Sequence, residues 1–384
     1  MPSPEIPQEI IDCIIGELQY QPRALVACSL VSHSFVPTSQ RLLFSTLCLT
    51  SSKRSATLCQ MLFKSFQVNP YLAHLVEDLS FQLDNSMFGA HNTAFPPILR
   101  SLSHLRSFTL SGTQAIKWHE APGYQRVSLG AILHLPYLES VTISNILYFP
   151  MSLFTRSTQL KRLSLLDTTA ASPNLAETEP LNPTPRKGQL EYLFGGEGAA
   201  AARTTHTLVN FLAHQSSQLG VSQLRQFTAS VWWNEGVRAY QTAFNSSGKS
   251  LENLALSVGH PDNHPPLDTL SIGPLRHLRR LSVSIFEHAS SPKWLLHLIA
   301  SASEHNMIEE ISINTFSVDF GDVSWGQLDA VLTSAKFKCL RSIVLRYWKQ
   351  HIRGLLPEKQ FPRLLARSTF TVYHECDRVF PRNH

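Results

Sequence analysis

Residues 278–283, Leu278-Arg279-Arg280-Leu281-Ser282-Val283, contain the pattern that decides the fold: apolar, two variable positions, apolar, one variable position, apolar. Successive side chains of a β-strand point to opposite faces, so this pattern predicts a short strand with one buried face. The pattern recurs along most of the chain, with successive copies 22 to 34 residues apart. The copies begin at Val76, Leu105, Leu138, Leu160, Leu190, Leu224, Leu251, Leu278, Ile308 and Leu340.

Helical stripes lie between several of these strands, for example Leu295, Leu298, Ile299 and Ala302 at three- and four-residue steps. A strand and a helix about every 30 residues resemble a leucine-rich repeat, in which stacked units share one core. The resemblance implies an α/β solenoid with a parallel sheet over residues 76–384. The Asn or Cys that normally follows the leucines is missing and the spacing is irregular, so the repeat is degenerate.

Residues 168–189 interrupt the repeat. They are rich in Pro, Thr and Ala and nearly free of large apolar side chains. Such a segment buries too little apolar surface to hold one conformation. We therefore expect a mobile loop inserted in the solenoid.

The first 49 residues differ from the rest in charge. Four acidic side chains and two arginines give them a net charge of −2, and the whole chain, at +5, therefore carries +7 in the remainder. Three short stretches have apolar residues at helical spacing, and prolines at 7, 22 and 37 lie near the starts of these stretches. A bundle of three such helices is too small to hide so wide an apolar stripe. A partner must cover the excess, or the helices cap the following domain.

Three blocks of this segment resemble an F-box, especially that of F-box proteins from mushroom-forming (basidiomycete) fungi. The blocks are Ile6-Pro7-x-Glu9-Ile10-(x)3-Ile14-Ile15-(x)2-Leu18, Leu25-(x)2-Cys28-x-Leu30-Val31-Ser32-(x)2-Phe35 and Arg41-Leu42-Leu43-Phe44. Phe35 and Phe44 stand where many members have Trp, and Ile6 replaces the usual Leu. In the family this motif docks on the Skp adaptor. The resemblance assigns docking to Ile6, Pro7, Ile10, Ile14, Leu18, Leu25, Cys28, Leu30, Val31 and Phe35.

The resemblance implies a substrate-recognition receptor of a cullin–RING (SCF-type) ubiquitin ligase, with an F-box at 1–50, a helical linker at 51–75 and the repeats at 76–384. The receptor would hold an unidentified target protein, while separate enzymes supply ubiquitin. It would need no catalytic residue and no cofactor. Two alternatives stay open. One is an interaction scaffold outside any ligase, in which the first helices cap the solenoid, and the other is an enzyme with its site scattered among loops.

Composition narrows the class of protein. The 384 residues include 43% hydrophobic and 16% charged side chains, which indicates a folded chain with little charge for steering. Basic residues adjoin only in pairs, which disfavours nucleic-acid binding. Six scattered cysteines form neither a disulfide framework nor a Cys-x-x-Cys zinc pair. Without a signal-like start or an apolar run of about 18 residues, we expect an intracellular protein, cytoplasmic or nuclear, with no membrane contact.

Two local matches to chemical motifs fail. Residues 244–250, Phe-Asn-Ser-Ser-Gly-Lys-Ser, resemble the end of a P-loop, but Ala243 stands where its first glycine belongs. We interpret the segment as a helix-to-strand turn in which Gly248 ends the helix. His260, Asp262 and His264 share a loop with three prolines, which favours solvated side chains over a metal site. We therefore predict no metal site and no enzyme activity.

The residues that alternate with the buried strand positions are mostly Ser and Thr, with few charges and no large side chains. Large aromatic residues instead follow the strands by a few positions, where they either complete the core or contact a partner. The hypothesis from the sequence is that one side chain of each adjacent pair contacts the target. These residues are Trp232, Trp233, Tyr347 and Trp348.

Overall fold

A computed structural model describes residues 6–49, 53–83, 94–171, 188–196, 199–213, 219–232, 234–259, 269–285, 293–315, 318–319, 323–348, 352–353, 357–367 and 370–375. The chain divides into two compact units. The first comprises residues 1–147 with 156–160, and the second comprises residues 148–155 with 161–384.

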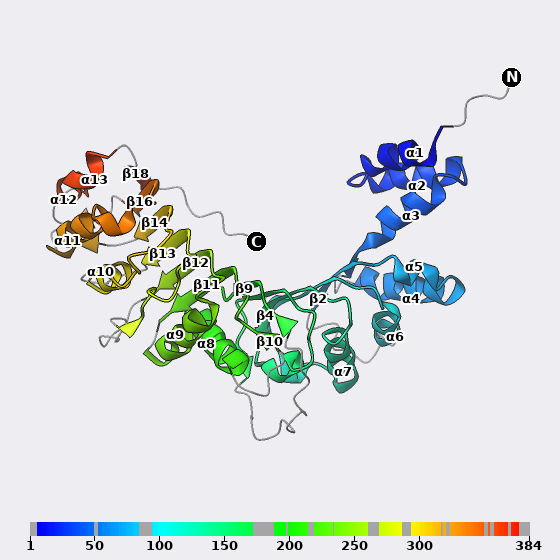
Figure 1. Cartoon of the computed structure of the whole chain (residues 1–384). Coiled ribbons are helices and arrows are strands. Elements are labelled where there is room, and N and C mark those ends of the chain that lie inside the picture. Colours follow the sequence, from blue (N-terminus) through cyan, green and yellow to red (C-terminus); the bar gives the residue numbers. More distant parts are fainter. Residues whose placement is uncertain are drawn as a thin grey trace. The chain divides into compact units, whose positions relative to one another are not determined.

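The first unit begins with three helices, as predicted (Figure 1). Proline precedes the first helix, opens the second and lies in the first turn of the third, where its missing N–H costs no hydrogen bond. Strands and helices then alternate. The elements are α1 (Gln8–Gly16), α2 (Pro22–Val31), α3 (Val36–Ser45), β1 (Thr46–Leu49), α4 (Lys53–Val68), α5 (Tyr71–His74), β2 (Asp78–Leu83), α6 (Phe95–Ser101), β3 (Ser107–Lys117), η2 (Trp118–Glu120), α7 (Gly123–Ile132) and β4 (Ser140–Leu147).

Four parallel strands of this unit pair in the order β1-β2-β3-β4. The register aligns Leu79, Phe108 and Val141, all buried, so the apolar positions of successive repeats stack on one another. The Phe81 ring of β2 stacks on that of Phe95 from α6 at 4.1 Å between centroids, which ties sheet to helix. The sheet begins at β1, one strand before the first predicted one.

The second unit continues the alternation. Its main strands pair, all parallel, in the order β6-β9-β11-β12-β13-β14-β16-β18. The elements are β5 (Phe149–Pro150), η3 (Met151–Phe154), β6 (Arg162–Leu166), β7 (Ala170–Ala171), β8 (Gly188–Gln189), β9 (Tyr192–Phe194), α8 (Ala199–Ala213), β10 (Leu219–Gly220), β11 (Gln226–Val231), α9 (Asn234–Ser247), β12 (Asn253–Val258), β13 (Arg280–Ile285), α10 (Lys293–Ala300), β14 (Glu310–Thr315), β15 (Val318–Asp319), α11 (Val323–Leu332), η5 (Ala335–Phe337), β16 (Ser342–Trp348), β17 (Ile352–Arg353), α12 (Pro357–Gln360), α13 (Pro362–Leu365) and β18 (Phe370–Glu375).

The predicted α/β architecture with a parallel, repeat-like sheet is confirmed. Strand β13 shows the principle, because Leu281, Val283 and Ile285 are buried. Ser282 and Ser284, which alternate with them, are half-buried on the other face. In Figure 1, helices α8–α11 all lie along one side of strands β11–β16. The buried positions of the strands pack toward these helices, and the opposite sheet face is left for the Ser and Thr side chains.

The structure describes only the two ends of the insertion predicted at about 168–189. Thr168 is buried, and the hydroxyl of Thr204 donates to its carbonyl oxygen, so the chain is anchored here. Strands β7 and β8 then extend the ordered chain into the predicted loop from either side. Within the predicted insertion, residues 172–187 lie outside the described part of the chain.

The predicted helix-to-strand turn at Gly248 is confirmed. Helix α9 ends at Ser247 and β12 begins at Asn253. A Cβ on Gly248 would lie 2.6 Å from the carbonyl oxygen of Pro274, so only glycine fits without movement of the backbone. This contact, and not a bound phosphate, accounts for the glycine.

Candidate functional site

The polar side of α1 is hydrogen-bonded to α3 and to the turn before α3. Helices α1 and α2 both pack against α3. The hydroxyl of Thr38 in α3 donates to a carboxylate oxygen of Asp12, and the Gln8 amide donates to the same oxygen at 2.9 Å. The Gln8 amide also donates to the Ser34 carbonyl oxygen at 2.9 Å, in the turn before α3. The bond from Thr38, followed by that from Gln8, lowers the pKa of Asp12 below its usual value.

This arrangement leaves apolar side chains on the outside. At 100° per residue, Ile10 and Ile14 lie on the side of α1 opposite Gln8 and Asp12. Ile14 is 59% exposed, whereas Ile15, on the packed side of the helix, is buried. The usual amphipathic order is therefore reversed on half of the helix, with polar groups inside and isoleucine outside.

Helix α2 also has more exposed than buried large apolar side chains. Leu25 is buried at 1% exposure, but Leu30 and Val31 are 83% and 73% exposed. Among the large apolar side chains of residues 6–45, two are buried, Ile15 and Leu25, and seven are exposed. We call these seven the apolar set: Ile6, Ile10, Ile14, Tyr20, Val26, Leu30 and Val31.

The structure sorts the ten residues that the resemblance assigns to adaptor docking. The exposed ones can meet a partner directly, while the buried one supports the helices from within. Exposed are Ile6, Pro7, Ile10, Ile14, Leu30 and Val31; half-buried are Leu18, Cys28 and Phe35; buried is Leu25. The sequence reasoning did not include Tyr20 and Val26, although Val26 lies one helical turn before Leu30 and its spacing could have revealed it.

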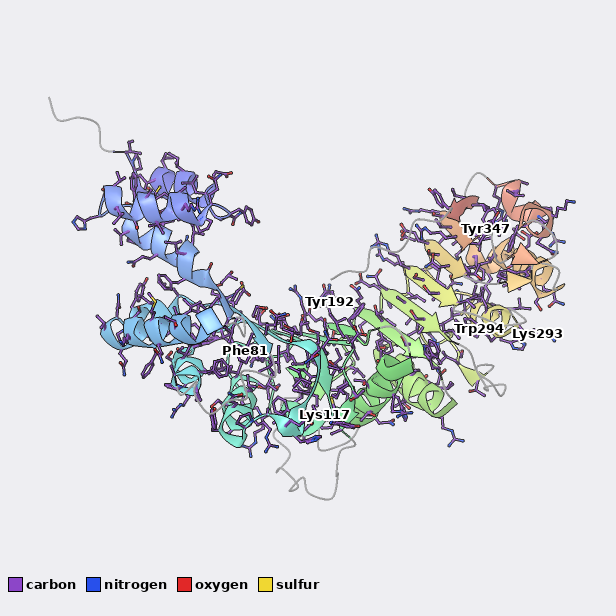
Figure 2. All side chains as sticks on the ribbon, turned by 180° about the vertical axis from the view of Figure 1, so that it is seen from behind. Phe81, Lys117, Tyr192, Lys293, Trp294 and Tyr347 are labelled. Carbon is purple, nitrogen blue, oxygen red and sulfur yellow. The ribbon has the colours of Figure 1, made fainter. Side chains whose placement is uncertain are left out.

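The structure describes the side chains of two of the four aromatic residues proposed for target contact. Tyr347, labelled in Figure 2, is 1% exposed, so its ring belongs to the core and Trp348 is the member of that pair left for the hypothesis. Trp232 is half-buried against the end of β12, where a Cβ on Gly259 would lie 2.1 Å from its indole ring. Trp233 and the side chain of Trp348 lie outside the part of the chain that the structure describes.

The second unit has a different candidate surface, the open face, which we define as the face of strands β6–β18 turned away from helices α8–α11 (Figure 1). Its central row is made of small side chains in continuous register on neighbouring strands. They form the floor of a hollow of about 410 Å³. This row is Thr228, Ala255, Ser282, Ser312 and Val344.

Charged groups line this hollow on one side and at one end. Along the side, Nε of Arg280 lies 3.1 Å from a carboxylate oxygen of Glu310. At the end, Nη1 of Arg346 donates to the Ser312 hydroxyl at 3.1 Å and to Oδ1 of Asn314 at 3.3 Å. The Arg346 guanidinium also lies 5.7 Å from the centre of the Tyr373 ring, a cation–π distance.

The described residues contain no group of three or more His, Cys, Asp or Glu side chains placed to hold a metal ion. The loop with His260, Asp262 and His264 lies outside them. None of the described helices has the length and apolar character needed to cross a membrane.

No protein-family model matches this chain, and no curated protein matches it either.

Proposed function

We propose that this chain is a substrate-recognition receptor of a cullin–RING (SCF-type) ubiquitin ligase. Its N-terminal helices would act as an F-box that binds the Skp adaptor, and its repeat units would bind a target protein. The observation that carries the proposal is the apolar set, because five of its seven exposed side chains are among the ten residues that the resemblance assigns to docking. Exposed apolar side chains gathered on a small segment mark an interaction surface.

The proposed mechanism is proximity. The adaptor would hold α1–α3, the second unit would hold the target, and a separate enzyme would deliver ubiquitin to the target's lysines. Tethering raises the effective concentration of those lysines near the enzyme, so the receptor itself contributes no catalytic residue.

The alternative of a scaffold whose first helices cap the sheet accounts for part of the structure. Helix α3 contacts β1 and α5 and leads directly into the sheet, as a cap would. Capping gives no role to Ile10 and Ile14, which lie on the side of α1 opposite its bonds to α3. We therefore favour adaptor binding.

The test is binding of the purified full chain to the Skp adaptor. Ile14 and Leu30 are exposed, so an Ile14→Ser/Leu30→Ser variant should fold normally. Each of these side chains should contribute about 1–2 kcal/mol to adaptor binding. Loss of both should therefore weaken the affinity for the adaptor by about 30-fold or more. The matched control is Val127→Ser on α7, also exposed in the first unit, which should bind like wild type.

Two results would refute the proposal. If the folded wild-type chain did not bind the adaptor, the scaffold alternative would be favoured. If the double variant bound as tightly as the Val127→Ser control, the apolar set would not be the docking surface.

A further inference from the structure

The hollow on the open face has a floor without large side chains. The side chains at Ala255, Ser282 and Ser312 are short, so a bound backbone can approach the sheet closely. The serine hydroxyls can donate to or accept from its peptide groups. From β11 to β16 the hollow spans four strand spacings of about 4.8 Å, or roughly 19 Å, which an extended chain covers with about six residues.

The charges of the hollow do not balance. Arg280 and Glu310 neutralise each other at 3.1 Å. Arg346 has only neutral partners among the residues that the structure describes, namely Ser312, Asn314 and the Tyr373 ring. The hollow therefore carries one positive charge that no described acidic group compensates. This charge, on Arg346, lies at one end of the hollow.

Arg346 is also held in a fixed orientation. Its hydrogen bonds to Ser312 and Asn314 both use Nη1, and the Tyr373 ring supports the guanidinium plane. No hydrogen bond from a described residue uses the edge formed by Nε–H and Nη2–H, so this edge can meet a ligand. Two parallel N–H donors of this kind match the two oxygens of a carboxylate.

The balance of charge favours one carboxylate over a phosphate. A phosphorylated side chain carries about two negative charges at neutral pH. In this hollow it would meet a single guanidinium, that of Arg346, without an acidic partner among the described residues. The Arg280–Glu310 pair in the same hollow has no net charge, so a second negative charge would find no compensating group there. A single Asp or Glu side chain compensates Arg346 without this excess.

We propose that the open face of the second unit binds an extended segment of about six residues with one Asp or Glu carboxylate on Arg346. The bound segment is taken to belong to the target of the receptor, so this inference rests on the proposed function and names its substrate class. Residues on either side of the acid would be small and uncharged, because they lie on the floor of short side chains.

The experiment measures retention of peptide pools on the immobilised full chain without the adaptor. Each pool holds acetylated and amidated hexapeptides of Gly, Ala, Ser and Thr with one fixed residue at either end: Glu, Gln, phosphoserine or Lys. We expect about tenfold higher retention of the Glu pool than of the Gln pool, the size of a charge-assisted hydrogen-bonded pair. The difference should disappear in Arg346→Gln. It should persist in Arg341→Gln, whose exposed guanidinium lies just before β16 beside Glu309.

Several results would overturn the inference. Equal retention of the Glu and Gln pools, or of all pools, would exclude a carboxylate site. Preference for the phosphoserine pool would replace the carboxylate with a phosphate, and preference for the Lys pool would reverse the charge argument. An unchanged preference in Arg346→Gln would move the site elsewhere. The peptide experiment contains no adaptor, so a negative result in it does not affect the adaptor-binding test. Equally, failure of the chain to bind the adaptor would not change the result of the peptide experiment.

Discussion

Asp329 should control the stability of the C-terminal end of the second unit. This side chain on α11 is 2% exposed, and its two carboxylate oxygens accept from the backbone N–H groups of Arg363 at 3.1 Å and Leu364 at 2.9 Å. These donors belong to the first turn of α13, where N–H groups have no partner within the helix. Asp329 thus caps a helix that lies 34 residues further along the chain.

Asp329→Ala removes both acceptors and leaves two buried or half-buried donors unpaired. Hydrogen bonds to a charged acceptor contribute about 1.5–3 kcal/mol, and loss of a helix cap typically costs about 1 kcal/mol. We therefore expect local opening to become easier by about 2–4 kcal/mol, which corresponds to roughly 30-fold or greater loss of amide protection. Asp329→Asn keeps one acceptor oxygen and should show about half of the free-energy effect.

Hydrogen exchange followed by mass spectrometry measures this effect in peptides that cover residues 357–367, with peptides from α10 as the internal reference. Contacts in repeat architectures are mostly between neighbours, so the loss should be local. Exposed Glu304→Gln is the control and should change nothing. Loss of protection below about threefold in Asp329→Ala, or a larger loss in Asp329→Asn, would refute the capping argument.

Two further predictions concern the N-terminal helices and the end of β12. The lowered pKa of Asp12 means that its stabilising effect is complete above the unfolded value of 3.8 and is lost as the pH falls through the lower folded value. Pepsin should therefore cleave residues 6–45 faster in Asp12→Asn than in wild type at a pH of about 5. The ratio of the two rates should fall toward one as the pH is lowered further and further below 3.8, and a constant ratio would contradict this. Gly259→Ala places a methyl group 2.1 Å from the Trp232 indole, so it should shift tryptophan emission and destabilise by about 1–3 kcal/mol in urea unfolding. Unchanged emission and stability would show that Trp232 moves freely.

The repeat period and the apolar alternation were enough to predict the parallel sheet. Buried positions such as Leu281 and Val283 recur from repeat to repeat, so the pattern becomes clearer with each further copy along the chain. Strand β18 (Phe370–Glu375) escaped prediction because it keeps only Phe370 and Val372 on the side that pairs with Ile343 and Leu345. Local spacing could not predict the contact at Thr168, because its carbonyl oxygen accepts from a distant hydroxyl, that of Thr204.

The candidate binding surfaces could be predicted less well from the sequence than the fold, because they depend on tertiary packing. Helical spacing places Ile10, Ile14 and Ile15 on one broad stripe, but only the packing of α1 on α3 separates the exposed pair from the buried third. Position relative to a strand suggested that Tyr347 lies at the rim, whereas the register of β16 turns its ring into the core.

The sequence alone determined the class of fold and the excess of apolar residues in the first helices, because both follow from local spacing and composition. Tertiary structure decided which side chains reach a partner. Arg346 meets Tyr373 and Ser312 only because β14, β16 and β18 are neighbours in the sheet, although they are about 30 residues apart in the chain. No local pattern encodes such a meeting, since it depends on strand register, and register is set by the packing of the whole core.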